Sequence, residues 1–218
     1  MSLERHWPLF GLRIETPRIL LVHPRDEDLS ALSSVASEGI HDPALMPFDI
    51  PWTDAPAEDL PRNSLQYWWG LRASWKPSSW HLAMAVRQGP TVVGVQSLFA
   101  TDFGITGQVA TGSWLGRSYQ GRGIGKEMRA AILHLAFAGL GAERAISGAF
   151  EDNAASIAVS TALGYRENGD DIKAPRGTPR RQIRFLLQRT AWERRRRADI
   201  HIHGLEPCLP MFGISKNG

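Results

Sequence analysis

The sequence predicts a mixed α/β domain built on one β-sheet, and three observations predict it. The chain has 218 residues, 43% of them hydrophobic and 22% charged, which is ordinary for one globular domain with a sizeable core. Short runs of alternating hydrophobic residues, typical of strands, are interleaved with stretches of helical spacing. In the second half the order is strand, loop, helix, strand, helix, and helical crossovers between neighbouring strands imply a parallel pair at the centre of the sheet.

The first third of the chain is expected to contain a strand, a helix and a long irregular loop. Residues 12–23 alternate well enough for a strand, although Pro17 confines its first half to a sheet edge. Acidic residues then open a helix over 24–36, because carboxylates favour the first turn and apolar residues follow at helical spacing. Five prolines within 39–61 exclude a long helix there, so we expect a semi-rigid loop that can shape a pocket.

The middle of the chain is expected to form an aromatic helix and a β-hairpin. Residues 63–75 have helical spacing and an unusual share of tryptophan and tyrosine. Residues 80–86 and 91–99 each alternate like strands, and Gln88-Gly89-Pro90 between them is a turn signal. A further strand is expected over 108–116.

The second half is expected to supply the parallel pair and the last strands. An apolar stripe on one face predicts a helix packed on the sheet, while Asn153 and Gly164 are typical helix-capping residues. Residues 170–180 are polar and rich in turn formers. The expected elements are a helix over 125–139, a strand over 144–150, a helix from Asn153 to Leu163, a last core strand over 182–188 and, after a basic run at 194–197, a possible extra strand over 200–203.

Composition and charge exclude several classes of protein. The single cysteine, Cys208, excludes an intramolecular disulfide and a cysteine-built zinc site, and it fits a reducing, cytoplasmic setting. No apolar run reaches the ~18 residues that a membrane span needs, and residues 1–8 are too polar for a secretory signal. The net charge is +3, with the basic residues in small local groups. We therefore expect neither a membrane nor a nucleic-acid partner.

The most informative segment is a glycine-rich loop between an expected strand and an expected helix. Gly121, Gly123 and Gly125 stand at alternate positions, where the absence of side chains lets successive backbone N–H groups converge on an anion. The helix N-terminus adds a positive dipole end at the same place. Four cationic residues against Glu127 leave a local charge of +3, and these residues are Arg117, Arg122, Lys126 and Arg129. The segment predicts a polyphosphate-binding loop.

Two familiar phosphate-binding patterns do not fit this loop. The P-loop pattern needs glycine in place of Gln120 and serine or threonine in place of Glu127. The dinucleotide fingerprint needs its third glycine in place of Lys126. A glycine-rich connection without any ligand stays open from the glycines alone.

The segment Gln120-Gly121-Arg122-Gly123-Ile124-Gly125 matches the Q/R-x-x-G-x-G/A acyl-CoA-binding motif of the GNAT superfamily of N-acetyltransferases. Residues 112–128, followed by 153–159 and 163–165, resemble the RimJ/RimL type, which acylates N-terminal α-amines of ribosomal proteins or small amines. The resemblance covers roughly residues 12–192. It implies a GNAT fold, which is a central, mostly antiparallel sheet with one splayed parallel strand pair flanked by helices. Residues 1–192 would form the acyltransferase domain and 193–218 a C-terminal extension.

The same resemblance implies a binding mode for the acyl-CoA co-substrate and a reaction that needs no metal. Backbone groups of Ser113, Trp114 and Leu115 would bind pantetheine between the splayed strands, and the N–H of Leu115 would polarise the thioester carbonyl. Asn153 would hydrogen-bond the pantetheine arm, or it is an ordinary helix cap. The diphosphate would be held by the loop residues Gln120, Gly121, Arg122, Gly123, Ile124, Gly125 and Lys126.

The implied reaction is direct attack of a neutral amine on the thioester of acetyl-CoA or succinyl-CoA. Residues 41–53 and the tail resemble an actinobacterial subgroup for which succinyl-CoA has been proposed as donor. Many relatives place a tyrosine acid seven residues after the asparagine, and here that position is Ser160. Ser156 is the substitute we expect, with a plain first-turn helix residue as the alternative. For the base the candidates are Glu167, Asp102 and Asp170, each of which could instead be a solvated surface carboxylate.

Other features lead to further expectations. Trp52 and either Trp68 or Trp69 could wall the acceptor site. The extra C-terminal strand would offer an edge for a homo-oligomer. Because Ser160 replaces the tyrosine, a non-catalytic CoA sensor of the same fold is the main alternative to an enzyme. An RNA-associated factor acting through the arginine run at 194–197 is a second alternative.

Overall fold

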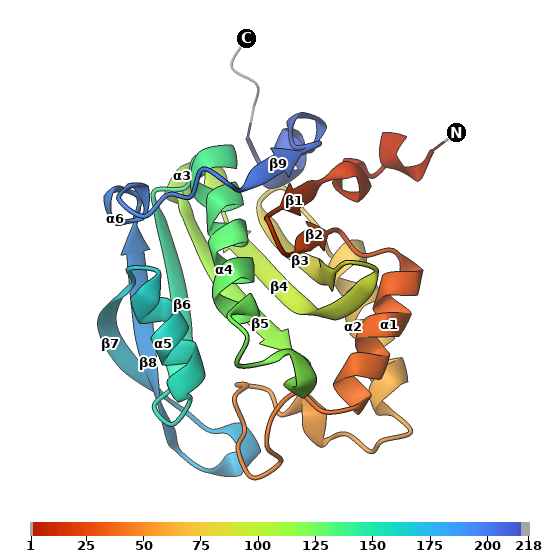
Figure 1. Cartoon of the computed structure of the whole chain (residues 1–218), viewed down its shortest axis with the longest axis vertical. Helices are drawn as coiled ribbons and strands as arrows, with labels where there is room; N and C mark the ends of the chain where they lie inside the picture. The colour runs from red at the N-terminus through yellow and green to blue at the C-terminus, as the bar shows by residue number, and fades with distance from the viewer. Residues whose placement is uncertain (1, 215–218) are drawn as a thin grey trace.

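The computed structural model describes residues 2–214 and contains a nine-stranded sheet in the order β7-β8-β6-β5-β4-β3-β2-β1-β9 (Figure 1). All neighbouring strands are antiparallel except β5 and β6, which are parallel. This confirms the predicted mixed α/β fold. The strands are β1 (Arg13–Glu15), β2 (Leu20–Val22), β3 (Ser79–Gln88), β4 (Thr91–Thr101), β5 (Gln108–Leu115), β6 (Arg144–Phe150), β7 (Arg166–Lys173), β8 (Arg180–Gln188) and β9 (His201–His203).

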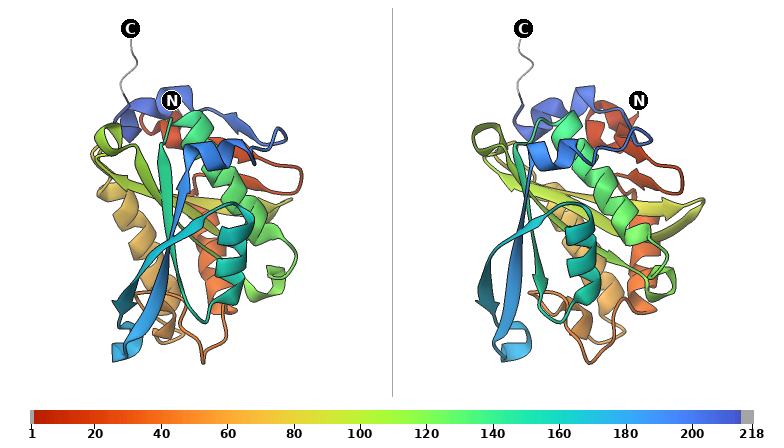
Figure 2. Two further views of the ribbon diagram at one scale, coloured as in Figure 1. Left: turned by 90° about the vertical axis from the view of Figure 1, so that its left-hand side faces the viewer. Right: turned by 60° about the vertical axis from the view of Figure 1, so that its left-hand side comes forward.

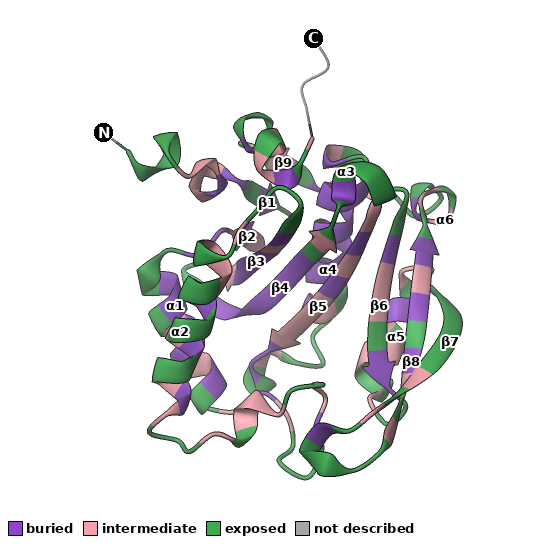
Figure 3. Ribbon diagram, turned by 180° about the vertical axis from the view of Figure 1, so that it is seen from behind, coloured by how far each residue is buried: buried purple, intermediate pink, exposed green. Residues whose placement is uncertain are grey.

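Helices cover both faces of the sheet, and two separate apolar clusters hold them there. α4 (Ile124–His134), continued by a π-helical turn over Leu135–Gly139, and α5 (Ala154–Ala162) lie on one face, as Figures 1 and 2 show. α1 (Asp26–Ser37) and α2 (Leu60–Ala73) lie on the other face and leave the middle of the sheet uncovered (Figure 3). Two short helices, α3 (Phe103–Thr106) and α6 (Arg189–Glu193), follow β4 and β8.

The parallel strands β5 and β6 separate soon after they meet. They pair only through Gln108 with Arg144, Val109 with Ala145, and Ala110 with Ile146. Beyond these residues β5 stays paired with β4 and β6 stays paired with β8 (Figure 1). We call the unpaired stretch, residues 111–115 of β5 and 147–150 of β6, the splay. The predicted splayed pair is confirmed.

The structure differs from the sequence prediction at both ends of the sheet. Residues 12–23 do not form one strand, because the chain turns at Pro17 and Arg18 and β1 pairs back onto β2. Part of the turn-rich segment at 170–180 belongs to β7, which pairs only with β8 and is exposed along most of its length. A solvent-exposed edge strand carries no hydrophobic alternation, so its sequence gives no strand signal.

The C-terminal tail is part of the sheet. The expected extra strand is confirmed as β9, which pairs with β1 at the outer edge, while Cys208 and Phe212 are fully buried in the larger core cluster. The basic run follows the end of α6, and within it Arg197 pairs with Asp199 and Arg196 lies over the Trp192 ring. Among the described residues no helix is long and apolar enough to cross a membrane.

Two histidines, the buried His23 and the half-buried His81, indicate that the folded protein is sensitive to acid. Burial, reinforced by Arg72 and Arg25, lowers the pKa of His23 to about 3, and burial lowers the pKa of His81 to about 4. The unfolded chain therefore binds more protons than the native state below an ordinary histidine pKa of about 6.5, and stability falls as the pH falls through this range. For His23 alone we expect a loss of about 2 kcal/mol between pH 6.5 and pH 5, at up to about 1.4 kcal/mol per pH unit.

Urea unfolding at several pH values between 5 and 6.5 measures this loss of stability. Most carboxylates titrate below this range, so they contribute little to the change. His23→Gln should show a flatter pH dependence than the parent protein, whereas the matched substitution of an exposed histidine, His201→Gln, should not. Equal slopes for all three proteins would contradict the expectation.

Candidate functional site

The glycine-rich loop presents a row of backbone N–H groups that the protein itself does not use. The Gln120 N–H donates to the Arg117 carbonyl at 3.2 Å, and the first helical bond of α4 runs from the Glu127 N–H to the Gly123 carbonyl at 3.2 Å. Between them, the N–H groups of residues 121–126 have no acceptor among the residues that the structure describes. Unpaired amides at a helix N-terminus are suited to bind a phosphate.

The glycines of this loop are required for different reasons. Gly121 and Gly123 have φ angles of +73° and +78°, a left-handed conformation that side chains rarely adopt. Gly125 lies in the first turn of α4, and a Cβ there would meet only Leu115 Cδ1 at an ordinary 3.7 Å. Neither the backbone nor the packing of the protein demands glycine at position 125. Its absent side chain leaves room for a ligand.

Three of the four predicted cations are exposed residues within the loop or next to it in the chain. Arg117, Arg122 and Lys126 are exposed, and within residues 2–214 no carboxylate lies within ion-pair distance of them. Arg129 does not join them, because it lies on the inner side of α4 and is buried. The positive charge available to an anion therefore comes from the first three residues and the helix N-terminus.

Gln120 holds the loop in shape. Its side-chain amide donates to the Ile40 carbonyl at 2.7 Å and to the Leu115 carbonyl at 2.9 Å, which ties the loop to the end of β5 and to the start of the α1–α2 connection. Its backbone N–H is also occupied. The free amides thus begin at Gly121.

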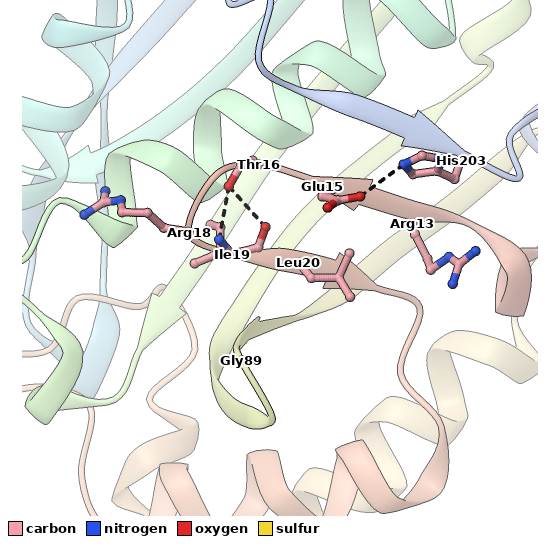
Figure 4. A pocket seen from close by; sticks show the side chains of 8 residues that line it. All are labelled: Arg13, Glu15, Thr16, Arg18, Ile19, Leu20, Gly89 and His203. Atoms are coloured by element: carbon pink, nitrogen blue, oxygen red, sulfur yellow. Dashed lines mark hydrogen bonds and ion pairs between the residues drawn. The ribbon is translucent and has the colours of Figure 1, made fainter.

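The buried Glu127 fixes the glycine-rich loop to the β1–β2 turn. The sequence did not predict this role. Glu127 accepts hydrogen bonds from Thr16 Oγ1 at 2.6 Å and Arg18 Nε at 2.5 Å, and Arg18 Nη1 donates to the Arg122 carbonyl at 3.0 Å. Burial alone would raise the pKa of Glu127, but these hydrogen bonds outweigh it and the pKa lies below its usual value. Figure 4 shows Thr16 and Arg18 on the β1–β2 turn, beside a pocket of about 430 Å³.

The backbone of β5 directs two predicted pantetheine ligands into the splay. The Gly116 N–H donates to the Val93 carbonyl of β4 at 3.0 Å. Because hydrogen-bonded pairs alternate along an antiparallel ladder, the N–H groups of Ser113 and Leu115 point away from β4, toward β6. The structure places these two residues at the splay. The backbone groups of Trp114 face β4 instead.

On the α4–α5 face the splay contains a polar cluster. The Arg129 guanidinium donates to the hydroxyls of Ser113 at 3.2 Å, Ser147 at 3.4 Å and Ser160 at 3.1 Å. The Tyr165 hydroxyl lies 3.4 Å from Thr111 Oγ1 in the same region. Burial lowers the pKa of Arg129 and raises that of Tyr165. The spacing of these residues in the sequence does not predict this cluster, because they come from separate helices and strands.

The start of α5 lies next to this cluster. Asn153 Oδ1 accepts a hydrogen bond from the Ser156 N–H at 3.1 Å, so Asn153 is a helix cap. The Ser160 hydroxyl donates to the Ser156 carbonyl at 3.0 Å and is fully buried. Ser156 itself is half-buried, and within the described part of the chain its hydroxyl has no hydrogen-bond partner. That hydroxyl is available to a ligand.

The proline-rich loop, residues 39–61, lies on the opposite face of the splay. Trp52 lies 6.1 Å, ring centre to ring centre, from Trp114, whereas Trp68 packs in the core and Trp69 lies near Asp26. A cavity of about 470 Å³ lies between α2 and the sheet on the same face. The loop is tied to the β7–β8 hairpin by Asp54 with Arg176, the Met46 carbonyl with Arg180, and Asp49 with Gln182.

The structure does not bring the predicted base candidates to the splay. Glu167 is exposed on the outermost strand β7, which β8 separates from β6. Asp170 lies on the same strand and pairs with Arg181 at 2.9 Å. Asp102 is exposed before α3, with a φ of +48°. These carboxylates are therefore not near the splay in space.

The sequence pattern of one family spans this site. The family described as Acetyltransferase (GNAT) domain matches residues 18–166, more than half of the chain. The chain belongs to the GNAT acetyltransferase family. The predicted family and enzyme class are thereby confirmed.

Solved GNAT structures share the fold at low sequence identity. Mycobacterium smegmatis RimJ in complex with CoA-disulfide has a TM-score of 0.68 and 19% identity, over 83% of this chain and 88% of that one. RimL, a ribosomal L7/L12 α-N-protein acetyltransferase in complex with coenzyme A, has a TM-score of 0.63 and 18% identity, over 79% and 95%. The microcin C7 self-immunity acetyltransferase MccE, with acetyl-CoA and AMP, has a TM-score of 0.60 and 17% identity, over 79% and 93%.

Proposed function

We propose that this GNAT protein is an acyl-CoA-dependent N-acyltransferase that transfers an acyl group from a CoA thioester to a primary amine. The observation that carries the proposal is the row of unused N–H groups at residues 121–126, placed directly beside the splay. The RimJ, RimL and MccE structures contain CoA or acetyl-CoA, which supports the same ligand here.

The ligand would lie along the site in an order set by its chemistry. The diphosphate would bind the amides of residues 121–126 and the cations Arg117, Arg122 and Lys126. The pantetheine arm would follow the splay past Ser113. The N–H of Leu115 would then donate to the thioester oxygen, where negative charge develops during the reaction.

The acceptor would approach from the face that Trp52 and Trp114 line. We propose an α-amine, of a protein N-terminus, a peptide or a small molecule, that attacks the thioester directly. Such an amine has a pKa near 8, so its deprotonation at pH 7 costs only about 1 kcal/mol, whereas a lysine amine would need nearly 5. The reaction therefore does not require a strong base, in keeping with the distance of Glu167 from the splay.

Mass spectrometry tests this function. The purified protein is incubated separately with acetyl-CoA and succinyl-CoA, the two donors expected, against a panel of amines and peptides. Acyl transfer with either donor supports the proposal. Tight CoA binding without transfer to any acceptor would favour the non-catalytic sensor, which the replacement of a tyrosine by the buried Ser160 motivates. Failure to bind either acyl-CoA in calorimetry would contradict both.

Ser156→Ala is expected to lower kcat by about 10-fold with little change in KM, because its free hydroxyl would donate a hydrogen bond, without transferring its proton, to the leaving sulfur mainly in the transition state. Steady-state kinetics with a saturating acceptor measures this. Ser34→Ala, at a helical serine that bonds only its own helix, is the matched control and should leave kcat unchanged. If Ser156→Ala had the kinetics of the parent protein, Ser156 would have no catalytic role and would be only a residue of the first turn of α5.

Self-association would use the edge of the sheet. Within residues 2–214, β9 is the outermost strand next to β1, and its outer edge would pair with a second copy. Light scattering in solution measures the mass of the assembly.

A further inference from the structure

Arg129 is a buried cation without a counter-ion. It is 5% exposed, and among the described residues no other arginine or lysine is buried. Its partners are neutral serine hydroxyls, its Nε has no hydrogen-bond partner, and within residues 2–214 no carboxylate lies within 4 Å of it. Such an arrangement is rare because a buried charge is normally paired.

The arrangement leaves positive potential in the splay. Removing a guanidinium from water costs several kcal/mol, and hydroxyl dipoles return only part of it. Burial lowers the pKa of Arg129, yet an arginine stays protonated in proteins at neutral pH. An anion that entered this part of the splay would supply the missing counter-charge at low local dielectric.

The position of Arg129 relative to the two faces of the sheet identifies that anion. Its guanidinium bridges Ser113 of β5 and Ser147 of β6, just beyond the last paired residues, on the face that α4 and α5 cover. Trp52 and Trp114 line the opposite face. When an amine adds to the thioester carbon from that opposite face, the sulfur bends away from the amine and toward the face of Arg129. Collapse of the tetrahedral adduct then expels the sulfur as a thiolate.

We propose that Arg129 is a catalytic residue that stabilises the CoA thiolate as it leaves. This proposal rests on the proposed function. The amine nitrogen forms the C–N bond, the C–S bond breaks, and its electron pair stays on sulfur beside the guanidinium. The proton lost by the amine passes to water, and the thiolate takes up a proton from water after transfer. The products are an amide and CoA thiol, and no side chain needs to donate a proton to the sulfur.

This assignment explains how the site operates without an acid at position 160. The Ser160 hydroxyl donates to the Ser156 carbonyl and accepts from Arg129, so its own proton is directed away from the splay. A charge that is unneutralised until the thiolate forms favours the transition state over the bound substrate. A carboxylate at the far end of a succinyl donor is the competing anion. It would extend beyond the carbonyl carbon, toward the acceptor face and away from Arg129.

The pKa of the thiol of bound CoA tests the proposal, measured by the ultraviolet absorbance of the thiolate during a pH titration. A free thiol titrates near pH 8.5, and on the parent protein we expect a value lower by at least about one unit. Arg129→Met, which removes the charge at similar volume, should return the pKa to that of free CoA and lower kcat more than about 30-fold with KM nearly unchanged. Arg129→Lys should keep part of the shift.

Several outcomes would overturn the proposal. An unshifted thiol pKa on the parent protein does so without any variant. So does an Arg129→Met protein that keeps the parent thiol pKa and loses affinity only for succinyl-CoA, because Arg129 would then recognise the donor carboxylate. Calorimetry with CoA is run in parallel, so that failure of the parent protein to bind CoA, which defeats the proposed function, is distinguished from binding without a thiol shift, which defeats this proposal alone.

Discussion

Gly125→Glu is expected to abolish CoA binding, with a loss of affinity of more than about 100-fold, while the fold stays intact. The new side chain would start in the first turn of α4, where the N–H groups of residues 121–126 have no protein acceptor. Its carboxylate would occupy the phosphate position and repel the diphosphate. The protein tolerates the change because a Cβ there meets only Leu115 at 3.7 Å, and an acid suits a helix N-terminus.

Isothermal calorimetry with CoA measures the loss, and thermal unfolding checks the fold. The matched control is Gly70→Glu, at an exposed glycine of α2 where an added Cβ would have no neighbour within 4 Å. It should bind CoA like the parent protein. Parent-like affinity of Gly125→Glu would mean that the phosphates do not lie on this loop.

Glu127→Ala is expected to lower the free energy of unfolding by about 2 to 4 kcal/mol and to weaken CoA binding about tenfold. Glu127 is 3% exposed, and its carboxylate joins the β1–β2 turn to α4 through Thr16 and Arg18. Its removal leaves the buried Thr16 hydroxyl without this partner. It also frees Arg18, whose guanidinium otherwise fixes the Arg122 carbonyl of the loop.

Urea unfolding and calorimetry measure the two effects. Glu143→Ala is the control, since it removes an acid that is 68% exposed and pairs with Arg189 at 3.3 Å, and exposed pairs contribute at most about 1 kcal/mol. Equal stabilities of the two variants would show that Glu127 is not an anchor of the loop.

The parts of the site that lie on one short segment could be predicted from sequence. The glycines of residues 121–125 act through their own backbone angles and small size, so their spacing already indicates the loop. The order of strands and helices around it indicates the parallel pair, and the family resemblance adds the splay. Asn153 is likewise local, because a helix cap acts within one turn.

The parts that depend on distant contacts could not be predicted. Glu127 and Arg18 are 109 residues apart, and the sequence shows Glu127 only as an acid that reduces the charge of the loop. The sequence groups Arg129 with the phosphate-binding cations, although its place on the helix turns it inward onto serines of three other elements. Glu167 is close to α5 along the chain, but β8 lies between its strand and β6.

The crystal structure of the complex with CoA tests the central claim most directly. We expect diphosphate oxygens within about 3.2 Å of the backbone nitrogens of residues 121–126, and the pantetheine arm between Ser113 and Ser147. A complex in which the diphosphate lies elsewhere, with these N–H groups bonded only to water or to the protein, would contradict the account.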